Sequence, residues 1–234
     1  MSAVVDDARR SVLQRRIRWI VGFTIVYNLI EAGVSVAAGA AASSAALIGF
    51  GLDSLVEVLS AAAVAWQFTR REPERYERAT LRVIAVSFFL LAAYVVAHSL
   101  LTLTGVLPDA EHSTIGLVIT ALSIVIMPLV SWFERRTGRE LGSATAVADS
   151  KQTLICTYLS AAVLLGLLLN QTLGWAWADS LAALVIAVFA VREGVEAWKG
   201  DPCATPVGML LEESDEHHEH EHDHEHDHGE ARRG

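Results

Sequence analysis

The chain has 234 residues, of which 53% are apolar, and its mean hydropathy is +0.39. A soluble domain of this length buries one core beneath a polar surface, so the composition excludes that class of protein. The formal net charge of −9 comes from an acidic tail, whereas the stretches that flank the apolar blocks are basic. We expect no nucleic-acid partner. The two cysteines, Cys156 and Cys203, are too few for a secreted disulfide framework.

Long apolar blocks divide most of the chain. Blocks of about 20 residues match the ~30 Å hydrocarbon core of a bilayer at 1.5 Å per helical residue. They are too long for strands, and an open sheet cannot satisfy its backbone hydrogen bonds in lipid. We therefore predict an all-α integral membrane protein, a bundle of six transmembrane helices. The six blocks cover residues 17–39, 44–68, 80–104, 115–133, 144–169 and 175–197.

The distribution of positive charge predicts the orientation in the membrane. Arginine and lysine gather before the first block, between the second and third, between the fourth and fifth, and after the sixth. The intervening loops contain neither residue. Because positively charged loops remain cytoplasmic, we predict that both termini are cytoplasmic. We also expect the protein to lie in the plasma membrane. The predicted parts are a cytoplasmic segment 1–16, a transmembrane domain 17–199 and a disordered cytoplasmic tail 200–234.

Two carboxylates interrupt the second block. Asp53 and Glu57 are four residues apart, so both project from one face of a helix. A central aspartate costs about 2.5–3.5 kcal/mol on insertion scales. The pair therefore predicts a site whose occupant is a proton or a metal ion. The alternative is a buried network bonded to polar side chains of neighbouring helices.

The fifth block carries a second polar stripe. Asp149, Gln152 and Cys156 follow one another at helical spacing and share one face. Counting along the two helices places Asp53 ~14 Å and Cys156 ~20 Å from the ends at which their helices enter, so both reach the middle of the bilayer. We expect Asp53, Glu57, Gln152 and Cys156 to converge there, although a small apolar filler is the alternative role for Cys156.

Three motifs together resemble the cation diffusion facilitator family. The second block reads DSLVE at 53–57, the fifth reads ADSKQTLIC at 148–156, and the sixth opens with WAD at 177–179. The resemblance spans roughly residues 15–200, the transmembrane part of that family. It implies six transmembrane helices with cytoplasmic ends, divalent-metal export, often by proton antiport, and often a homodimer.

The resemblance also implies a transport site with altered ligands. Where the family's usual site resembles two aspartates, a histidine and a further aspartate around zinc, this chain has Asp53, Glu57, Gln152 and Cys156. Sulfur favours softer metals and carboxylate favours harder ones. We expect zinc or cadmium first, then iron, cobalt, nickel or manganese, with Asp53 and Glu57 as proton carriers. A rival ligand set takes Asp149 in place of Gln152.

Other polar residues are weaker candidates for a second shell or an alternative ligand. Asn28 and Glu31 in the first block either line the ion path or fix packing. Lys151 either pairs with Asp149 or reaches another helix, and Asp179 either approaches the path or caps the last helix.

The tail alternates histidine with acidic residues over 212–228. Tracts rich in histidine bind metals, and the flanking carboxylates raise the local cation concentration. We predict metal capture by the tail, with a solubilising acidic segment as the alternative. Cys203 either adds a thiol ligand or has no role in metal binding. The histidines are His217, His218, His220, His222, His224, His226 and His228.

The pattern as a whole predicts a secondary-active exporter of divalent metal. The alternative is a non-transporting membrane sensor or buffer of metal that acts through the tail. We expect no enzyme and no organic cofactor, because the chain has no nucleophile–base pair and no nucleotide motif.

Overall fold

The structure, a computed structural model, describes residues 7–68, 73–141 and 144–199. Within these ranges the structure describes the backbone alone at residues 7, 8, 10, 14, 64, 65, 67, 68, 73–75, 77 and 144–152. The predicted all-α, six-helix fold is confirmed for the described residues. The helices are α1 (Asp7–Ala41), α2 (Ala45–Phe68), α3 (Pro73–Leu103), α4 (Thr114–Leu141), α5 (Ala144–Leu173) and α6 (Ala176–Lys199).

Several helices extend beyond the apolar blocks of the sequence. The first begins at Asp7, ahead of the block expected at 17–39, because Leu13 and Ile17 continue the buried face of α1 into its basic start. The third begins at Pro73, and proline suits the first helical position. Charged residues at these ends lie on helices and not in loops.

Among the described residues, five helices have an apolar stretch long enough to cross a membrane. These stretches are Ser11–Ala41, Ala45–Ala63, Arg78–Leu103, Thr114–Leu141 and Thr153–Leu173. The remaining helix, α6, has Asp179 near its start and Arg192 and Glu193 near its end. Its hydropathy alone therefore does not mark the sixth predicted span, although α6 packs within the bundle against α2, α3 and α5.

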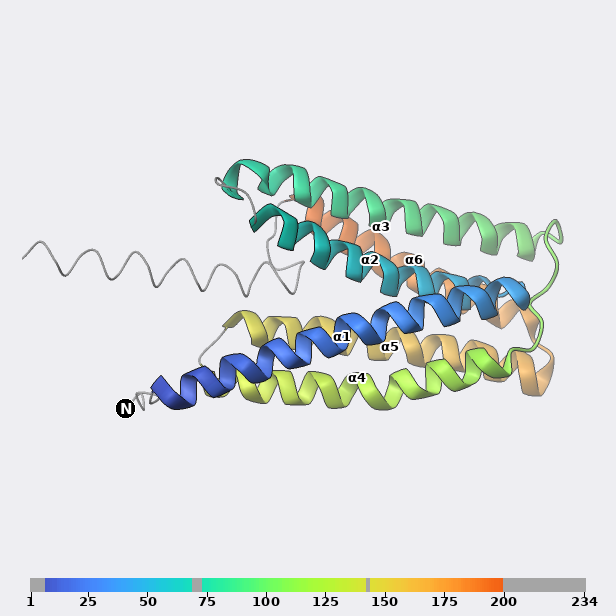
Figure 1. The fold of residues 1–234 in the computed structure, drawn as a ribbon. Coiled ribbons are helices and arrows are strands. Elements are labelled where there is room, and N and C mark those ends of the chain that lie inside the picture. Colours follow the sequence, from blue (N-terminus) through green and yellow to red (C-terminus); the bar gives the residue numbers. More distant parts are fainter. Residues whose placement is uncertain (1–6, 69–72, 142–143, 200–234) are drawn as a thin grey trace, which may run out of the picture.

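The helices form two groups that run side by side. In Figure 1, α2, α3 and α6 lie together, as do α1, α4 and α5. The first helix crosses between the groups, since it packs on both α4 and α2. Polar side chains such as Asn28 and Asp53 are buried inside the bundle, whereas Leu90 and Val188 are exposed on its surface. This arrangement suits a lipid environment, because intramembrane polar groups face a bundle interior.

Small residues bring α1 and α2 close together. A Cβ atom on Gly39 would lie 2.7 Å from the backbone nitrogen of Ile48. A Cβ atom on Gly51 would lie 2.9 Å from the backbone nitrogen of Val36. Both distances are shorter than real Cβ contacts, so glycine is required at both positions. The close approach places the polar residues of α1 against those of α2.

Asp179 fixes the start of α2, a helix other than its own. Its carboxylate accepts a hydrogen bond of 2.5 Å from Ser44 Oγ and one of 3.2 Å from the Ala46 backbone nitrogen. Ser44 in turn accepts a bond of 3.0 Å from the Leu47 nitrogen, so it is the N-cap of α2. The hydrogen bonds of Asp179 thus go to the amino end of a neighbouring helix, although Asp179 also lies in the first turn of its own helix, where its charge suits the amino end.

Candidate functional site

Glu57 is the point at which three helices meet. From α1, Asn28 Nδ2 donates a hydrogen bond of 2.8 Å to Glu57 Oε2. From α5, the Cys156 thiol donates to the other carboxylate oxygen, Oε1, across 2.7 Å. The second and fifth blocks thus touch through Glu57 and Cys156, two of the four residues expected to converge, and the convergence of all four stays a prediction. Cys156 is buried and bonded to a carboxylate, which an apolar filler would not be.

Only the nitrogen of the Asn28 side-chain amide forms a hydrogen bond with a described residue. Asn28 is 5% exposed, and its Oδ1 atom has no hydrogen-bond partner among the described residues. An unsatisfied buried acceptor costs about 1–3 kcal/mol of stability. The site therefore holds an oxygen atom, next to Glu57, whose hydrogen-bonding capacity is unused by the described part of the chain.

Asp53 lies one helical turn before Glu57 and is buried at 8% exposure. Among the described residues, none donates a hydrogen bond to its carboxylate. It lies within electrostatic range of Glu193 of α6 and Glu31 of α1, and also of the Cys156 thiol. Asp53 therefore contributes a carboxylate that accepts no hydrogen bond from a described residue, and it lies in the interior between α1, α2, α5 and α6.

Other predicted site residues lie where no side chain is described. Asp149, Lys151 and Gln152 belong to the backbone of α5, but their side chains are outside the described residues. The seven tail histidines and Cys203 lie outside the described ranges altogether. The choice between Gln152 and Asp149 as a ligand thus stays a prediction.

Glu31 is the centre of a second buried polar network. It is 2% exposed, and its Oε2 atom accepts a hydrogen bond of 2.7 Å from Ser54 Oγ. Its other oxygen, Oε1, accepts a hydrogen bond from Ser123 Oγ. Ser123 also shares a hydrogen bond of 2.7 Å with the Tyr27 hydroxyl. The network joins α1, α2 and α4 and so positions the helix that carries Asn28.

Sequence reasoning missed the partners of Glu31, and it also missed two further buried acids. Glu134 of α4 is 2% exposed and accepts a hydrogen bond of 3.3 Å from Thr153 Oγ1 of α5. Glu193 of α6 is 5% exposed. Both lie at the basic ends of apolar blocks, where a charged residue is predicted to be exposed to solvent. The signal that could have found Glu134 is the helical spacing that continues past the block to Leu141.

The arrangement combines hard and soft donor atoms in a membrane interior. Carboxylate oxygens and a thiol are metal ligands of different preference, and a thiol must lose its proton to coordinate a metal. Within the described residues, no group of three or more His, Cys, Asp or Glu side chains lies close enough together to hold a metal ion. Glu57 and Cys156 are in contact, and Asp53 would complete a three-ligand set only by approaching them.

Comparison with known proteins identifies the kind of bundle that holds this site. The family profile described as the cation efflux transmembrane domain matches residues 22–199, which include all of the polar residues described above in α2, α4, α5 and α6. A curated relative, the cation-efflux pump FieF of Shewanella oneidensis, is 34% identical over 86 residues. That match covers 37% of this chain and 29% of the relative's length. The chain therefore belongs to the cation efflux family, a family of transporters and not of enzymes, as the motifs of its second and fifth blocks predict.

Proposed function

We propose that the protein exports a divalent transition-metal cation across the membrane, with Asp53, Glu57, Gln152 and Cys156 as ligands of the transported ion. The observation that carries this proposal is the 2.7 Å contact between the Cys156 thiol and the Glu57 carboxylate. A carboxylate and a thiol from two helices share one point inside a membrane bundle. Intramembrane ionisable residues of this kind mark ion pathways.

The donor types favour zinc or cadmium as the substrate. Two carboxylates balance the charge of one dication, and a thiolate adds a ligand that selects softer metals. A tetrahedral site of mixed oxygen and sulfur ligands suits zinc. Iron, cobalt, nickel and manganese follow as weaker candidates. Gln152 supplies a neutral amide oxygen, and Asp149 replaces it in the rival ligand set.

Proton antiport follows from the chemistry of the same ligands. Metal binding displaces the thiol proton that now lies between Cys156 and Glu57, because the thiolate is the ligand form. When the site faces the cytoplasm, metal enters and protons leave. When it faces the opposite side, the metal departs, and Cys156 and the carboxylates of Asp53 and Glu57 take back the protons that they lost on metal binding. Asn28 holds Glu57 in place through both halves of the cycle.

Replacing Cys156 by serine tests this proposal. Serine keeps a hydroxyl donor for Glu57 but removes the soft ligand. Purified protein in proteoliposomes, with a pH gradient imposed and then removed, should show at least tenfold weaker cadmium transport for C156S and a smaller loss for manganese. Ser160→Ala, on the same buried face of α5, is the matched control. Unchanged cadmium flux in C156S would refute the ligand role.

Orientation, assembly and tail complete the proposal. We place both termini in the cytoplasm, as the positive charges predict, and labelling of single cysteines from each side of the membrane tests this. We propose a homodimer, tested by cross-linking in the membrane. The tail 200–234 captures metal on the side from which an exporter loads.

A further inference from the structure

A large groove separates the start of α1 from the end of α4, away from Glu57 and Cys156. The two helices are antiparallel neighbours here, and Arg9 forms a salt bridge of 3.2 Å with Glu140 at their ends. The groove has a volume of about 1460 Å³, whereas pockets for small molecules are typically ~300–1,000 Å³. Its size and its place on the outside of a membrane bundle favour a long ligand over a metal ion.

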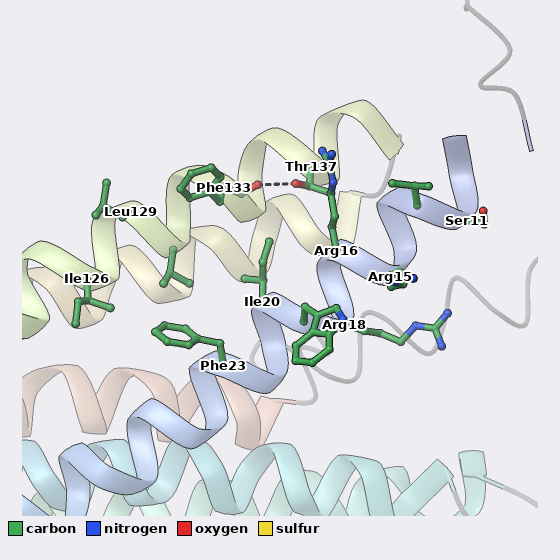
Figure 2. A pocket seen from close by; sticks show the side chains of 13 residues that line it. Ser11, Arg15, Arg16, Arg18, Ile20, Phe23, Ile126, Leu129, Phe133 and Thr137 are labelled. Atoms are coloured by element: carbon green, nitrogen blue, oxygen red, sulfur yellow. Dashed lines mark hydrogen bonds between the residues drawn. The ribbon is translucent and has the colours of Figure 1, made fainter. Parts of the chain in front are cut away.

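The groove has an apolar end and a cationic end. Phe23, Ile126 and Leu129 lie at one end, and Arg15 and Arg16 lie at the other (Figure 2). The residues from Arg15 to Phe23 extend over ~12 Å of helix at 1.5 Å per residue. A ligand along the groove would therefore meet apolar side chains at one end and positive charge at the other.

The positive charge at the cationic end has no counterion in the described part of the chain. Arg15, Arg16 and Arg18 are exposed, and none forms a salt bridge with a described residue. Glu140, at the end of α4, already pairs with Arg9 and with Arg136. Three positive charges within one helical turn thus have no acidic partner among the described residues and can bind an anion.

We propose that this groove binds an anionic phospholipid. Its head group lies at the cationic end of the groove, to which Arg15, Arg16 and Arg18 contribute positive charge, and an acyl chain lies along Phe23 and Leu129. Basic pockets between transmembrane helices bind anionic head groups, since each Arg or Lys near the surface attracts such lipids. Trp19, which is 73% exposed beside the arginines, suits the level of the head groups.

A second copy of the chain is a poorer occupant. A two-fold interface brings the same patch of both subunits together, so it would set three unpaired arginines against three others. The acidic run 212–228 has the right charge, and the apolar residues Val207, Met209, Leu210 and Leu211 precede it in the sequence, so the tail is the rival occupant that the deletion of 212–234 must exclude. A phospholipid carries the same two parts and is present wherever the bundle lies in a membrane.

Native mass spectrometry of the full chain tests the proposal. The protein is released from micelles that contain equal amounts of phosphatidylglycerol and phosphatidylcholine, which differ in head-group charge. The wild type should retain phosphatidylglycerol in preference. The triple variant R15Q/R16Q/R18Q should lose that preference by on the order of 10- to 100-fold. The triple variant R78Q/R135Q/R139Q removes three exposed arginines that form no salt bridge with a described residue and lie outside the groove, and it should keep the preference.

Several results would overturn the proposal. Equal retention of the two lipids by the wild type would do so, as would an equal loss of preference in both triple variants. Deletion of 212–234 provides a further arm. If phosphatidylglycerol binds only after that deletion, the tail and not a lipid occupies the groove. Soluble glycerol phosphate should compete poorly, and full displacement by it would show an anion site without a lipid chain.

Discussion

The Asn28 amide donates a hydrogen bond to Glu57, while its own Oδ1 atom has no partner among the described residues. These two features predict how Asn28→Ala changes stability and metal affinity. The substitution removes the 2.8 Å bond to Glu57 Oε2 but also removes the buried Oδ1 that has no partner among the described residues. The lost bond is worth about 1.5–3 kcal/mol when the acceptor is charged, and the removed acceptor returns about 1–3 kcal/mol. The two contributions nearly cancel, so the change in stability should be small.

Metal affinity should respond differently, because Glu57 is the ligand that Asn28 orients. Loss of a group that orients a ligand typically costs 10–100-fold in metal affinity. We expect this loss for zinc or cadmium in N28A, measured by competition with a chelating dye on purified protein. In an E57Q background the same substitution should have little further effect, since the two residues act as one unit.

Asn170→Ala is the matched control. Asn170 is 3% exposed on α5, and its Nδ2 donates a bond of 2.7 Å to the Ala110 carbonyl oxygen, far from Glu57 in the loop before α4. N170A leaves that carbonyl unsatisfied and should lower the free energy of unfolding by about 1–3 kcal/mol, with unchanged metal affinity. Wild-type affinity in N28A, or an equal loss of affinity in N170A, would refute the reasoning.

Three further predictions concern the bundle and the tail. Asp179→Ala removes both acceptors at the start of α2 and leaves Ser44 Oγ without that partner. The free energy of unfolding should fall by about 2–3 kcal/mol, measured as a lower melting temperature. Asp179→Asn should reduce the stability less. Gly39→Ala forces a Cβ atom against the Ile48 nitrogen and should destabilise the protein by about 1–3 kcal/mol. Gly22→Ala is the control, because a Cβ atom there would meet nothing within 4 Å, and it should be neutral or stabilising. Deletion of 212–234 should leave metal flux in proteoliposomes largely intact at saturating metal and reduce it at low metal; complete loss of flux would favour the sensor or buffer function.

Hydropathy and spacing predicted the parts of the fold that depend on single helices. Each apolar block became a helix, and the approach of Cys156 to Glu57 followed from counting residues along two helices. These inferences need only the rise of a helix and the thickness of a bilayer. The helix starts at Asp7 and Pro73 were not predicted, because charged residues dominate the sequence there and the few apolar residues, such as Leu13, do not form an apolar block.

Contacts that depend on how helices are rotated could not be predicted. Asp179 is separated by more than a hundred residues from Ser44, and nothing in its own helix shows that it meets the start of α2. The same holds for Glu31, whose partners Ser54 and Ser123 come from two other helices. Glycine at positions 39 and 51 permits this packing, but the sequence alone does not name the surface that each one faces.

X-ray absorption at the metal edge tests the central claim most directly. The sample is the protein with residues 212–234 deleted and Cys203→Ser, loaded with less than one equivalent of zinc, so that Cys156 is the only thiol present. The account predicts one sulfur ligand at ~2.3 Å together with oxygen ligands at ~2.0–2.2 Å, and loss of the sulfur ligand in a further C156S variant. A bound zinc ion with oxygen or nitrogen ligands alone would contradict it.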